Sequence, residues 1–315
     1  MQLAPEIRDY IEAQAARVPF AELERACTAL SAHYRGLGST ASLNLPAAAK
    51  TAAYLITRFP ATYAAAHSVL NELRHRLGDV RITSLLDLGA GPGGATLAAR
   101  GVFPSLKTCS LVESDPALAA VARELLPSAA AVLTRGLRAE ADYEAHDLVL
   151  ASYLLGELSE RDRSRVIDRA WLAARVALVI IEPGSTAGFA VVRAARDRLL
   201  AAGARLAAPC PAEGPCPIQA PDWCHFAARV ERTSLLRRMK RAALGYEDEK
   251  FSYVALTKTE TPRAQTRIIR RPEERPGLIQ LVVCRGDGIQ NEKVTRRKPE
   301  AFRSARKAKW GDEWA

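Results

Sequence analysis

The strongest constraint on the fold is an apolar run that breaks into alternating glycines, LLDLGAGPGG at residues 85–94. Apolar runs of this length bounded by glycine are typical of buried strands. The residues that follow, 95–100, have the composition of a helix. A strand, a glycine turn and a helix in this order predict the opening of a nucleotide-binding βαβ unit. Its glycines make the tight turn, let a ligand approach the backbone and let the helix pack on the strand.

The spacing of the glycines indicates which nucleotide the unit binds. The run Gly89-x-Gly91-x-Gly93 differs from the Gly-x-Gly-x-x-Gly pattern of dinucleotide enzymes, although Gly94 also permits that interpretation. An acidic residue is expected about 20 residues further on, at the tip of the next strand, and Glu113 fits. With Asp87 at the first strand tip, the pattern is similar to the class I methyltransferase motif. It favours S-adenosylmethionine over NAD or a purely structural turn. The residues expected to bind this cofactor are Asp87, Gly89, Ala90, Gly91, Gly93, Glu113, Ser114 and Ser152.

Length and composition suit one large globular domain, or one domain with an appendage. The chain has 315 residues, of which 48% are hydrophobic and 25% charged. The apolar stretch at 176–181 is too short to span a bilayer. The first six residues lack the basic and apolar regions of a signal peptide. We therefore expect a cytoplasmic protein with no membrane partner that is monomeric away from larger assemblies.

Helical and strand patterns divide the chain into three parts. Residues 1–79 predict a helical N-terminal domain, with Gly36 and Gly38 ending the second helix and Gly78 the last. Residues 80–294, with a cysteine-rich loop at 205–226, predict an α/β domain with a parallel sheet and right-handed crossovers. Residues 295–315 form a basic tail. The expected strands are 84–88, 108–113, 131–134, 147–152 and 176–182, and we expect 251–257 and 278–284 to pair as an antiparallel hairpin at the sheet edge.

Positive charge is concentrated in two segments of a chain whose net charge is +10. Residues 229–241 hold six basic residues against one acid, and residues 295–309 hold seven against one. Such concentration is the electrostatic footprint of a phosphate-backbone partner, with a solvated helix at 229–244 and a frayed tail as the alternative. The candidate contact residues are Arg237, Arg238, Lys240, Arg241, Arg296, Arg297, Lys298, Arg303, Arg306, Lys307 and Lys309.

No catalytic constellation accompanies the glycine loop. Enzymes that methylate exocyclic base nitrogens carry an Asp/Asn-Pro-Pro-aromatic turn after the fourth strand, where this chain has Ala-Ser-Tyr-Leu at 151–154. Enzymes that methylate pyrimidine carbon 5 need a cysteine nucleophile, and Cys109 is better explained as a core residue. Tyr153, Glu157 and Glu182 are possible polar groups at the crevice, with loop packing as the alternative. The catalytic residues therefore stay unassigned.

Four of the six cysteines form a candidate metal site. Cys210, Cys216 and Cys224 cluster among prolines, and Cys284 ends a late strand. Because disulfides are disfavoured in a reducing cytoplasm, converging thiolates suggest zinc or an iron–sulfur cluster. Zinc ribbons usually offer Cys-x-x-Cys pairs, which are missing here. The irregular spacing favours a cubane cluster, with zinc and unpaired structural thiols as alternatives and His225 as a substitute ligand.

These motifs occur together in an order that resembles one known family. They are DLGAGPG at 87–93, YLLGEL at 153–158, IEPG at 181–184, PCP at 209–211, CP at 216–217, DWCHF at 222–226, KFSY at 250–253 and ARKAKWGD at 305–312. The chain looks like a member of the methyltransferase-like family associated with the small ribosomal subunit, known in mitochondria as an assembly factor and present in bacteria. The resemblance covers roughly residues 45–312, and its cysteine block is more specific than its glycine loop.

The resemblance implies a class I methyltransferase fold that engages small-subunit rRNA during ribosome maturation. It also implies a [4Fe–4S] cluster held by Cys210, Cys216, Cys224 and Cys284. The basic residues would then bind rRNA, and the tail, short of apolar residues, is expected to fold only on RNA. An active methyltransferase acting on rRNA or a ribosomal protein is the alternative function, and a redox or iron sensor a third.

Overall fold

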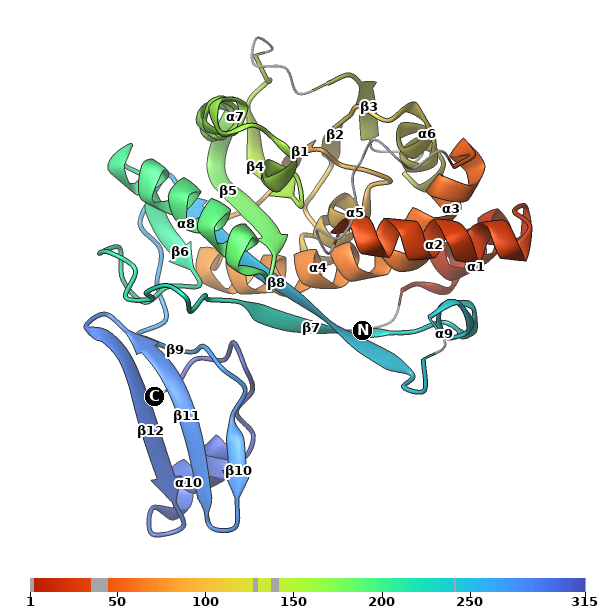
Figure 1. Cartoon of the computed structure of the whole chain (residues 1–315). Coiled ribbons are helices and arrows are strands. Elements are labelled where there is room, and N and C mark those ends of the chain that lie inside the picture. The colour runs from red at the N-terminus through yellow and green to blue at the C-terminus, as the bar shows by residue number, and fades with distance from the viewer. Residues whose placement is uncertain (1–2, 35–44, 127–129, 137–141, 241, 315) are drawn as a thin grey trace.

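The apolar runs that follow residue 79 form the buried central sheet of the computed structural model, which describes residues 3–34, 45–126, 130–136, 142–240 and 242–314 (Figure 1). Five parallel strands lie in the order β3-β2-β1-β4-β5. Because the strand order reverses between β1 and β4, their carboxyl ends border the crevice in which such sheets bind ligands. The strands are β1 (Ser84–Leu88), β2 (Thr108–Glu113), β3 (Ala130–Thr134), β4 (His146–Ser152) and β5 (Ala174–Pro183).

Three further strands complete this sheet. β8 (Tyr246–Thr257) runs antiparallel to β5, and β6 (Arg205–Ala208) pairs with the other edge of β8. β7 (Phe226–Glu231) pairs with the first half of β8. An antiparallel strand inserted next to the fifth strand is the arrangement of class I methyltransferases, so the predicted α/β fold is confirmed.

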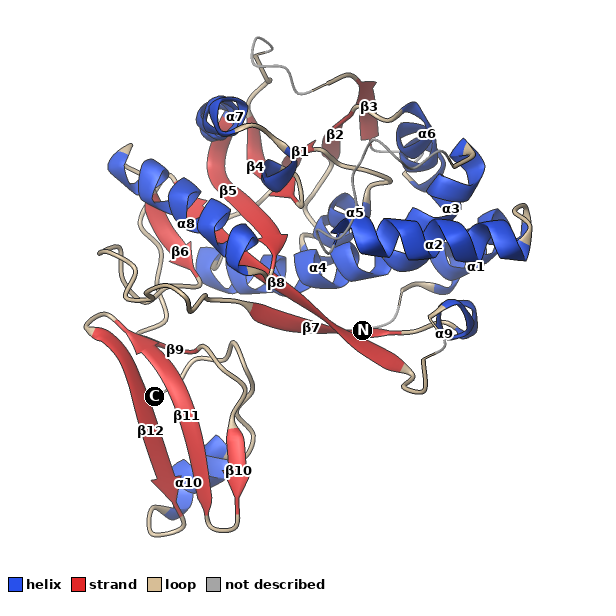
Figure 2. Ribbon diagram, viewed as in Figure 1, coloured by secondary structure: helices blue, strands red, loops and turns tan. Residues whose placement is uncertain are grey.

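Helices cover both faces of the sheet because alternate strand residues point to opposite sides (Figure 2). One face packs against α4 (Phe59–Leu77), α5 (Gly94–Val102) and α6 (Pro116–Leu125). The other packs against α7 (Glu160–Ala173) and α8 (Thr186–Ala201), with the short 3-10 helix η2 (Leu155–Glu157) beside them. Within the described ranges, no helix combines the length and apolar character needed to cross a membrane.

The N-terminal helices share a small core with a distant segment. α1 (Pro5–Ala16), α2 (Phe20–Tyr34) and α3 (Ala47–Thr57) pack together with α9 (Ser234–Met239). α4 ends at Gly78, as the sequence predicted, whereas Gly36 and Gly38 lie outside the described residues. α4 lies within the predicted N-terminal domain but packs in the core of the sheet. The domain boundary at residue 79 therefore stays a prediction.

The C-terminal residues form a separate small β module with its own core (Figures 1 and 2). Its strands lie in the order β10-β11-β12, with β9 on the other edge of β11. Its elements are β9 (Thr266–Ile268), β10 (Glu273–Arg275), β11 (Leu278–Arg285), β12 (Gly288–Thr295) and α10 (Pro299–Ala305).

The expected pairing of residues 251–257 with 278–284 is wrong. The first run lies inside β8, whose edges are taken by β5, β6 and β7. The second is β11, which turns through Gly286 and Asp287 and pairs with β12. A two-residue loop that contains glycine and aspartate is a strong local hairpin signal, so the C-terminal antiparallel hairpin is β11–β12.

The helix expected at 229–244 is also wrong for most of its length. β7 extends to Glu231, α9 has only six residues, and β8 begins at Tyr246. The run 226–231 alternates buried and more exposed side chains, which is the period of a strand. The Thr233 hydroxyl then accepts a hydrogen bond from the Leu236 amide and starts the helix there.

The expectation that the tail folds only on RNA is wrong as well. After α10 the chain returns to β9, where the Gly311 amide donates to the Ile268 carbonyl and the Ile268 amide donates to Asp312, both at 2.9 Å. Trp310 packs edge-on against His225, with ring centroids 4.7 Å apart. The tail is therefore ordered by backbone pairing and by an aromatic anchor.

Candidate functional site

The glycine loop leaves β1 in a backbone conformation that side chains rarely permit. Gly89, Gly91 and Gly93 have φ of +65°, +56° and +86°, in the left-handed region that favours glycine. A Cβ at Gly89 would lie 2.7 Å from Leu154 Cδ1, so this position also lacks space. The amides of Gly89 and Ala90 donate to the carbonyl of Val112, which ties the loop to β2.

Two polar atoms near this loop are buried and have no hydrogen-bond partner within the described ranges. Asp87 is 0% exposed, and its Oδ2 accepts a 2.6 Å hydrogen bond from the Thr96 hydroxyl. Its Oδ1, like the hydroxyl of Ser152 at the end of β4, finds no hydrogen bond among the described residues. Burial raises the pKa of Asp87 to about 7. Since an unsatisfied buried oxygen is costly, these atoms mark where a polar ligand or water would contribute hydrogen bonds.

Glu113, the expected ribose ligand, holds the glycine loop itself. Its Oε2 accepts a hydrogen bond from the Gly91 amide and its Oε1 accepts one from the Asp115 amide, both at 2.7 Å. Ser114 lies next to it and donates at 3.4 Å. Because each carboxylate oxygen has two acceptor sites, Glu113 positions the loop and keeps capacity for a further donor.

Side chains from α3 and from the segment after β4 lie beside the glycine loop. A Cβ at Gly91 would lie 3.4 Å from the hydroxyl of Tyr54. Arg58 lies over the ring of Tyr153, 5.2 Å from its centroid, and pairs with Glu249 at 3.3 Å. The Tyr153 hydroxyl donates to the same carboxylate at 3.0 Å, although Tyr153 has a φ of +55°. Left-handed backbone at a residue other than glycine often marks a functional site.

Glu182, near the end of β5, stabilises the loop that follows β4. Its carboxylate accepts hydrogen bonds from three successive amides, those of Leu154, Leu155 and Gly156, at 2.8 to 3.3 Å. Burial raises its pKa to about 7. The three bonds fix the turn, so they account for the position of Glu182 without a role in chemistry.

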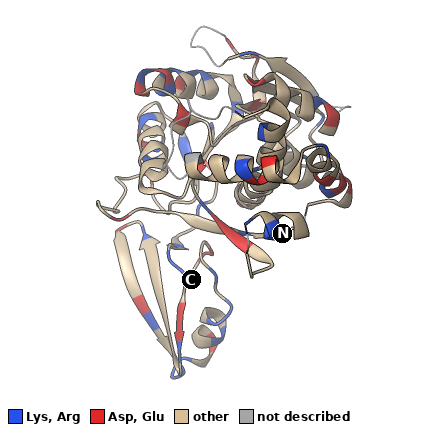
Figure 3. Cartoon of the chain, turned by 45° about the vertical axis from the view of Figure 1, so that its right-hand side comes forward, with Lys and Arg blue, Asp and Glu red and all other residues tan. Residues whose placement is uncertain are grey.

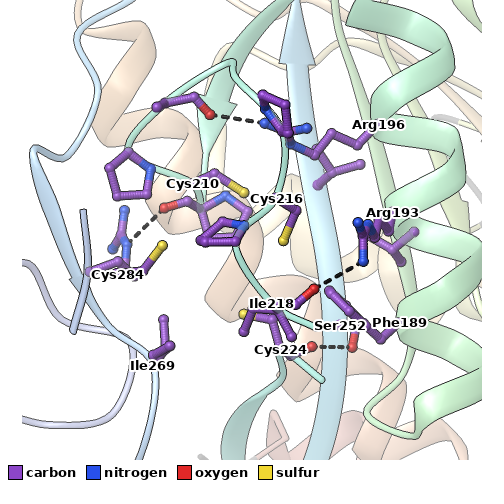
Figure 4. A pocket seen from close by; sticks show the side chains of 18 of the residues that line it. Phe189, Arg193, Arg196, Cys210, Cys216, Ile218, Cys224, Ser252, Ile269 and Cys284 are labelled. Atoms are coloured by element: carbon purple, nitrogen blue, oxygen red, sulfur yellow. Dashed lines mark hydrogen bonds between the residues drawn. The ribbon is translucent and has the colours of Figure 1, made fainter. Parts of the chain in front are cut away.

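The four candidate metal-binding cysteines line one cavity of about 160 Å³ (Figure 4). Cys210 follows β6, Cys216 lies in the proline-rich loop and Cys224 precedes β7. Cys284 comes from β11, so the cavity lies between the sheet and the C-terminal module. Residues that are 60 to 74 positions apart in the chain are thus brought to one place.

Burial disfavours the thiolate form of three of the four cysteines that line this cavity. Burial raises the pKa of Cys210, and burial with the neighbouring thiols raises the pKa of Cys224 well above its ordinary value. Burial raises that of Cys284 to about 12. In the described part of the chain, no three His, Cys, Asp or Glu side chains lie close enough together to hold a metal ion. The cavity therefore collects the thiols without forming a preset single-ion site.

The candidate nucleic-acid contacts fall on two separate surfaces (Figure 3). Arg237 and Arg238 lie on α9 and Lys240 follows it, while Arg241 lies outside the described residues. The α9 group is partly engaged, since Arg238 stacks on the ring of Phe20 and Lys240 pairs with Glu247. The remaining candidates are exposed around α10, and they are Arg296, Arg297, Lys298, Arg303, Arg306, Lys307 and Lys309.

Comparison with known proteins assigns the chain to a family. The family model described as mitochondrial small ribosomal subunit Rsm22 matches residues 48–315, which is more than half of the chain. The chain belongs to the Rsm22 family. This result confirms the family that the motifs predicted.

Relatives of this Rsm22-family chain are known from human and yeast. The human "Ribosome assembly protein METTL17, mitochondrial" is 28% identical over 304 residues, which cover 89% of this chain and 64% of that protein. The Schizosaccharomyces pombe "Rsm22-cox11 tandem protein 2, mitochondrial" is 26% identical over 321 residues, covering 82% and 42%. This chain therefore spans less than two thirds of either relative.

Solved structures similar to this chain include a putative RNA methyltransferase from Pyrococcus horikoshii. It has a TM-score of 0.42 and 17% identity, and the match covers 62% of this chain and 82% of that one. A likeness this distant does not bear on function, and the fold assignment rests on the strand order.

Two buried arginines of this Rsm22-family chain were missed in the sequence. Arg196 on α8 and Arg267 on β9 both line the cysteine cavity. An arginine is usually exposed, and nothing in the residues around either one distinguishes it from a surface cation. Only the tertiary structure identifies them.

Proposed function

We propose that this chain is an assembly factor of the small ribosomal subunit that binds its rRNA. The observation that carries this proposal is the Rsm22 family match over residues 48–315, whose description names the mitochondrial small ribosomal subunit. The human relative is named a ribosome assembly protein. The C-terminal module supplies a surface with the charge that such a partner requires.

The exposed cations around α10 are the proposed rRNA surface. Arg296, Arg297 and Lys298 lie between β12 and α10, and Arg303 lies on α10. Among the described residues none of these four has an ion pair, whereas Arg306 pairs with Glu274 at 3.6 Å, both largely exposed. Cations without local partners contribute most to phosphate binding, because no internal pair must be broken first.

Co-sedimentation with isolated small subunits tests the assembly-factor proposal. The wild-type chain should migrate with the small subunit on a sucrose gradient at low salt. A variant with Arg296, Arg297, Lys298 and Arg303 changed to Gln should stay at the top. Migration of both proteins with the subunit would exclude this surface, and migration of neither would contradict the function.

The cysteine cavity is the proposed site of a [4Fe–4S] cluster held by Cys210, Cys216, Cys224 and Cys284. A space of about 160 Å³ is comparable with a cavity of roughly 150 Å³ that accepts a benzene ring. It is far larger than one bare ion needs, and the thiols surround it without converging on a point. When bound, the cluster would act as a covalent clamp between the proline-rich loop and β11.

Iron and sulfide analysis of anaerobically purified protein tests the cluster. The wild-type chain should be brown and contain about four iron and four acid-labile sulfide per chain. Changing any of the four cavity cysteines to Ser should remove most of the iron. Cys109→Ala is the control, since Cys109 packs in the sheet core and does not line the cavity. Stoichiometric zinc, or iron that survives all four changes, would refute the cluster.

The glycine loop is the proposed S-adenosylmethionine site. Asp87, Gly89, Gly91 and Glu113 would hold the cofactor, with Ser152 offering a buried hydroxyl that has no partner among the residues described. Gly89→Ala should abolish binding measured by equilibrium dialysis, because its Cβ meets Leu154 and its φ is positive. Gly101→Ala is the control, since a Cβ there meets open space. Equal binding by both variants would place the cofactor elsewhere.

Active methyl transfer is the second candidate function. The left-handed backbone of Tyr153, whose hydroxyl donates to Glu249, favours this function. Purified protein incubated with labelled S-adenosylmethionine and immature small subunits should then transfer label, and Gly89→Ala should lose the activity. Absence of transfer by wild-type protein that binds the cofactor would remove this candidate and leave the assembly role.

A further inference from the structure

Arg196 is a buried cation at the wall of the cysteine cavity. Its side chain on α8 is 4% exposed. Together with all four cysteines it lines the same space (Figure 4). Its Nη2 donates hydrogen bonds to the carbonyls of Ala212 and Gly214, at 2.9 and 2.6 Å, and thereby holds the loop between Cys210 and Cys216.

The remaining donors of this guanidinium are only partly used. Nη1 donates to Asp197, a carboxylate whose side chain is half exposed and therefore well solvated. Nε is buried and has no hydrogen-bond partner in the described structure. A buried charged donor without an acceptor is destabilising, so its retention needs an explanation from the cavity.

The other arginines of the cavity have partners that account for them. Arg267, 2% exposed, pairs with Glu72 at 2.5 Å. Arg193 donates to the Ile218 carbonyl at 3.0 Å. Arg285 pairs with Glu292, and although its Nε also lacks a hydrogen-bond partner among the described residues, its side chain is 34% exposed. Arg196 is therefore the cavity arginine that is both buried and left with an unused donor among the described residues.

We propose that Arg196 is the internal counter-ion and hydrogen-bond donor for an anionic cofactor held by the four cysteines. This inference rests on the proposed iron–sulfur cluster. Four thiolates and a cubane core carry a net negative charge that increases on reduction. A fixed cation and an N–H donor close to the sulfurs favour the reduced form, since net charge and hydrogen bonds to sulfur set the reduction potential of such clusters. Arg196 therefore raises the potential of the cluster.

Three variants separate charge from loop geometry. Arg196→Gln removes the charge and keeps an amide donor. Arg196→Lys keeps the charge and loses the planar fork. Arg198→Gln is the matched control, because it removes a charge from the same helix at a site that is about half exposed and paired with Asp168. For each protein, iron content is measured first and the midpoint potential is then measured by a spectroscopically monitored titration.

We expect Arg196→Gln to lower the potential by the equivalent of about a tenfold change in the redox equilibrium, ~59 mV for one electron. Arg196→Lys should stay close to wild type, and Arg198→Gln should not differ from it. An unchanged potential in a cluster-bearing Arg196→Gln protein would overturn the inference. If the Arg196→Gln protein holds no cluster, the Arg196→Lys protein distinguishes the charge role of Arg196 from a role in positioning the loop. A cluster at the wild-type potential in the Arg196→Lys protein supports the charge role of Arg196. Loss of the cluster in the Arg196→Lys protein shows that Arg196 only positions the loop. Wild-type protein without iron would refute the cluster proposal instead.

Discussion

Burial disfavours the ionised form of the Asp87 carboxyl group. Its pKa of about 7 in the folded chain lies above its ordinary value of 3.8. The folded state therefore holds this proton more tightly than the unfolded state. The stabilisation is complete below pH 4 and is lost as the pH rises through 7.

Asp87→Asn isolates this effect. Relative to the variant, the wild-type free energy of unfolding should fall by roughly 3 kcal/mol between pH 5 and 8. Glu182, whose pKa burial also raises to about 7, is present in both proteins and cancels. Urea unfolding at each pH provides the measurement. Parallel pH profiles for the two proteins would show that Asp87 is not buried as described.

Some residues of the candidate site could be predicted from the sequence, and others could not. The four cysteines could be grouped from their irregular spacing and the family motifs, and the structure brings them to one cavity. Arg196 and Arg267 could not be found, because whether an arginine is buried depends on tertiary packing and not on its neighbours in the chain.

Arg267 on β9 joins three elements that are distant in sequence. Its Nε donates to the Pro209 carbonyl beside the cysteine loop, and its Nη1 donates to Gly311 in the tail. Its Nη2 pairs with Glu72 on α4. A buried guanidinium with every nitrogen engaged fixes the C-terminal module against the sheet.

Arg267→Met should destabilise the chain by about 3 kcal/mol, because it removes one partner of a buried ion pair and leaves two carbonyls unsatisfied. Arg270→Met is the control, since Arg270 pairs with the half-exposed Asp222 and should cost less than about 1 kcal/mol. Denaturant unfolding compares the two. Similar losses for both variants would mean that the Arg267 contacts add nothing beyond those of a surface pair.

Strands β1, β2 and β4 could be predicted because each is an apolar run that ends at a glycine or at a polar tip. β6 has four residues, too few to show a period. Residues 229–231 of β7 were mistaken for the start of a helix because Arg229 and Glu231 favour helices locally, and the pairing of β7 with β8 overrides that preference. The C-terminal module depends on the two-residue turn at 286–287, and the apolar run 278–284 does not by itself identify the strand with which it pairs.

The cysteine cavity lies among the contacts that join the C-terminal module to the sheet. Besides Arg267, the tail contributes Trp310 against His225 and an ion pair between Arg76 and Glu313. A cluster at the cavity would add a covalent link from the proline-rich loop to β11. Its removal should therefore loosen the module more than the sheet.

Hydrogen exchange of cluster-bearing and cluster-free protein measures this difference. Chelation should increase exchange in β9, β11 and the tail several-fold, while β1 and β4 keep their protection because they lie in the buried core. Trp310→Ala should enlarge the difference. A uniform increase over both parts would show that the cavity stabilises the chain globally, and no increase would show that it does not link them.

The uneven charge of the chain determines how salt affects RNA binding. For each phosphate that a protein neutralises, the slope of log K against log salt steepens by about 0.7 to 0.9. Changing Arg296, Arg297, Lys298 and Arg303 to Gln should therefore reduce the slope for small-subunit rRNA by about 3. A control variant removes the same charge from exposed sites elsewhere. It changes Arg81 and Lys107, before β1 and β2, and Arg161 and Arg165, on α7, to Gln. Fluorescence anisotropy over a salt series gives both slopes. Equal reductions would mean that RNA responds to net charge alone, whereas a loss confined to the first variant identifies the C-terminal module as the surface that contacts rRNA phosphates.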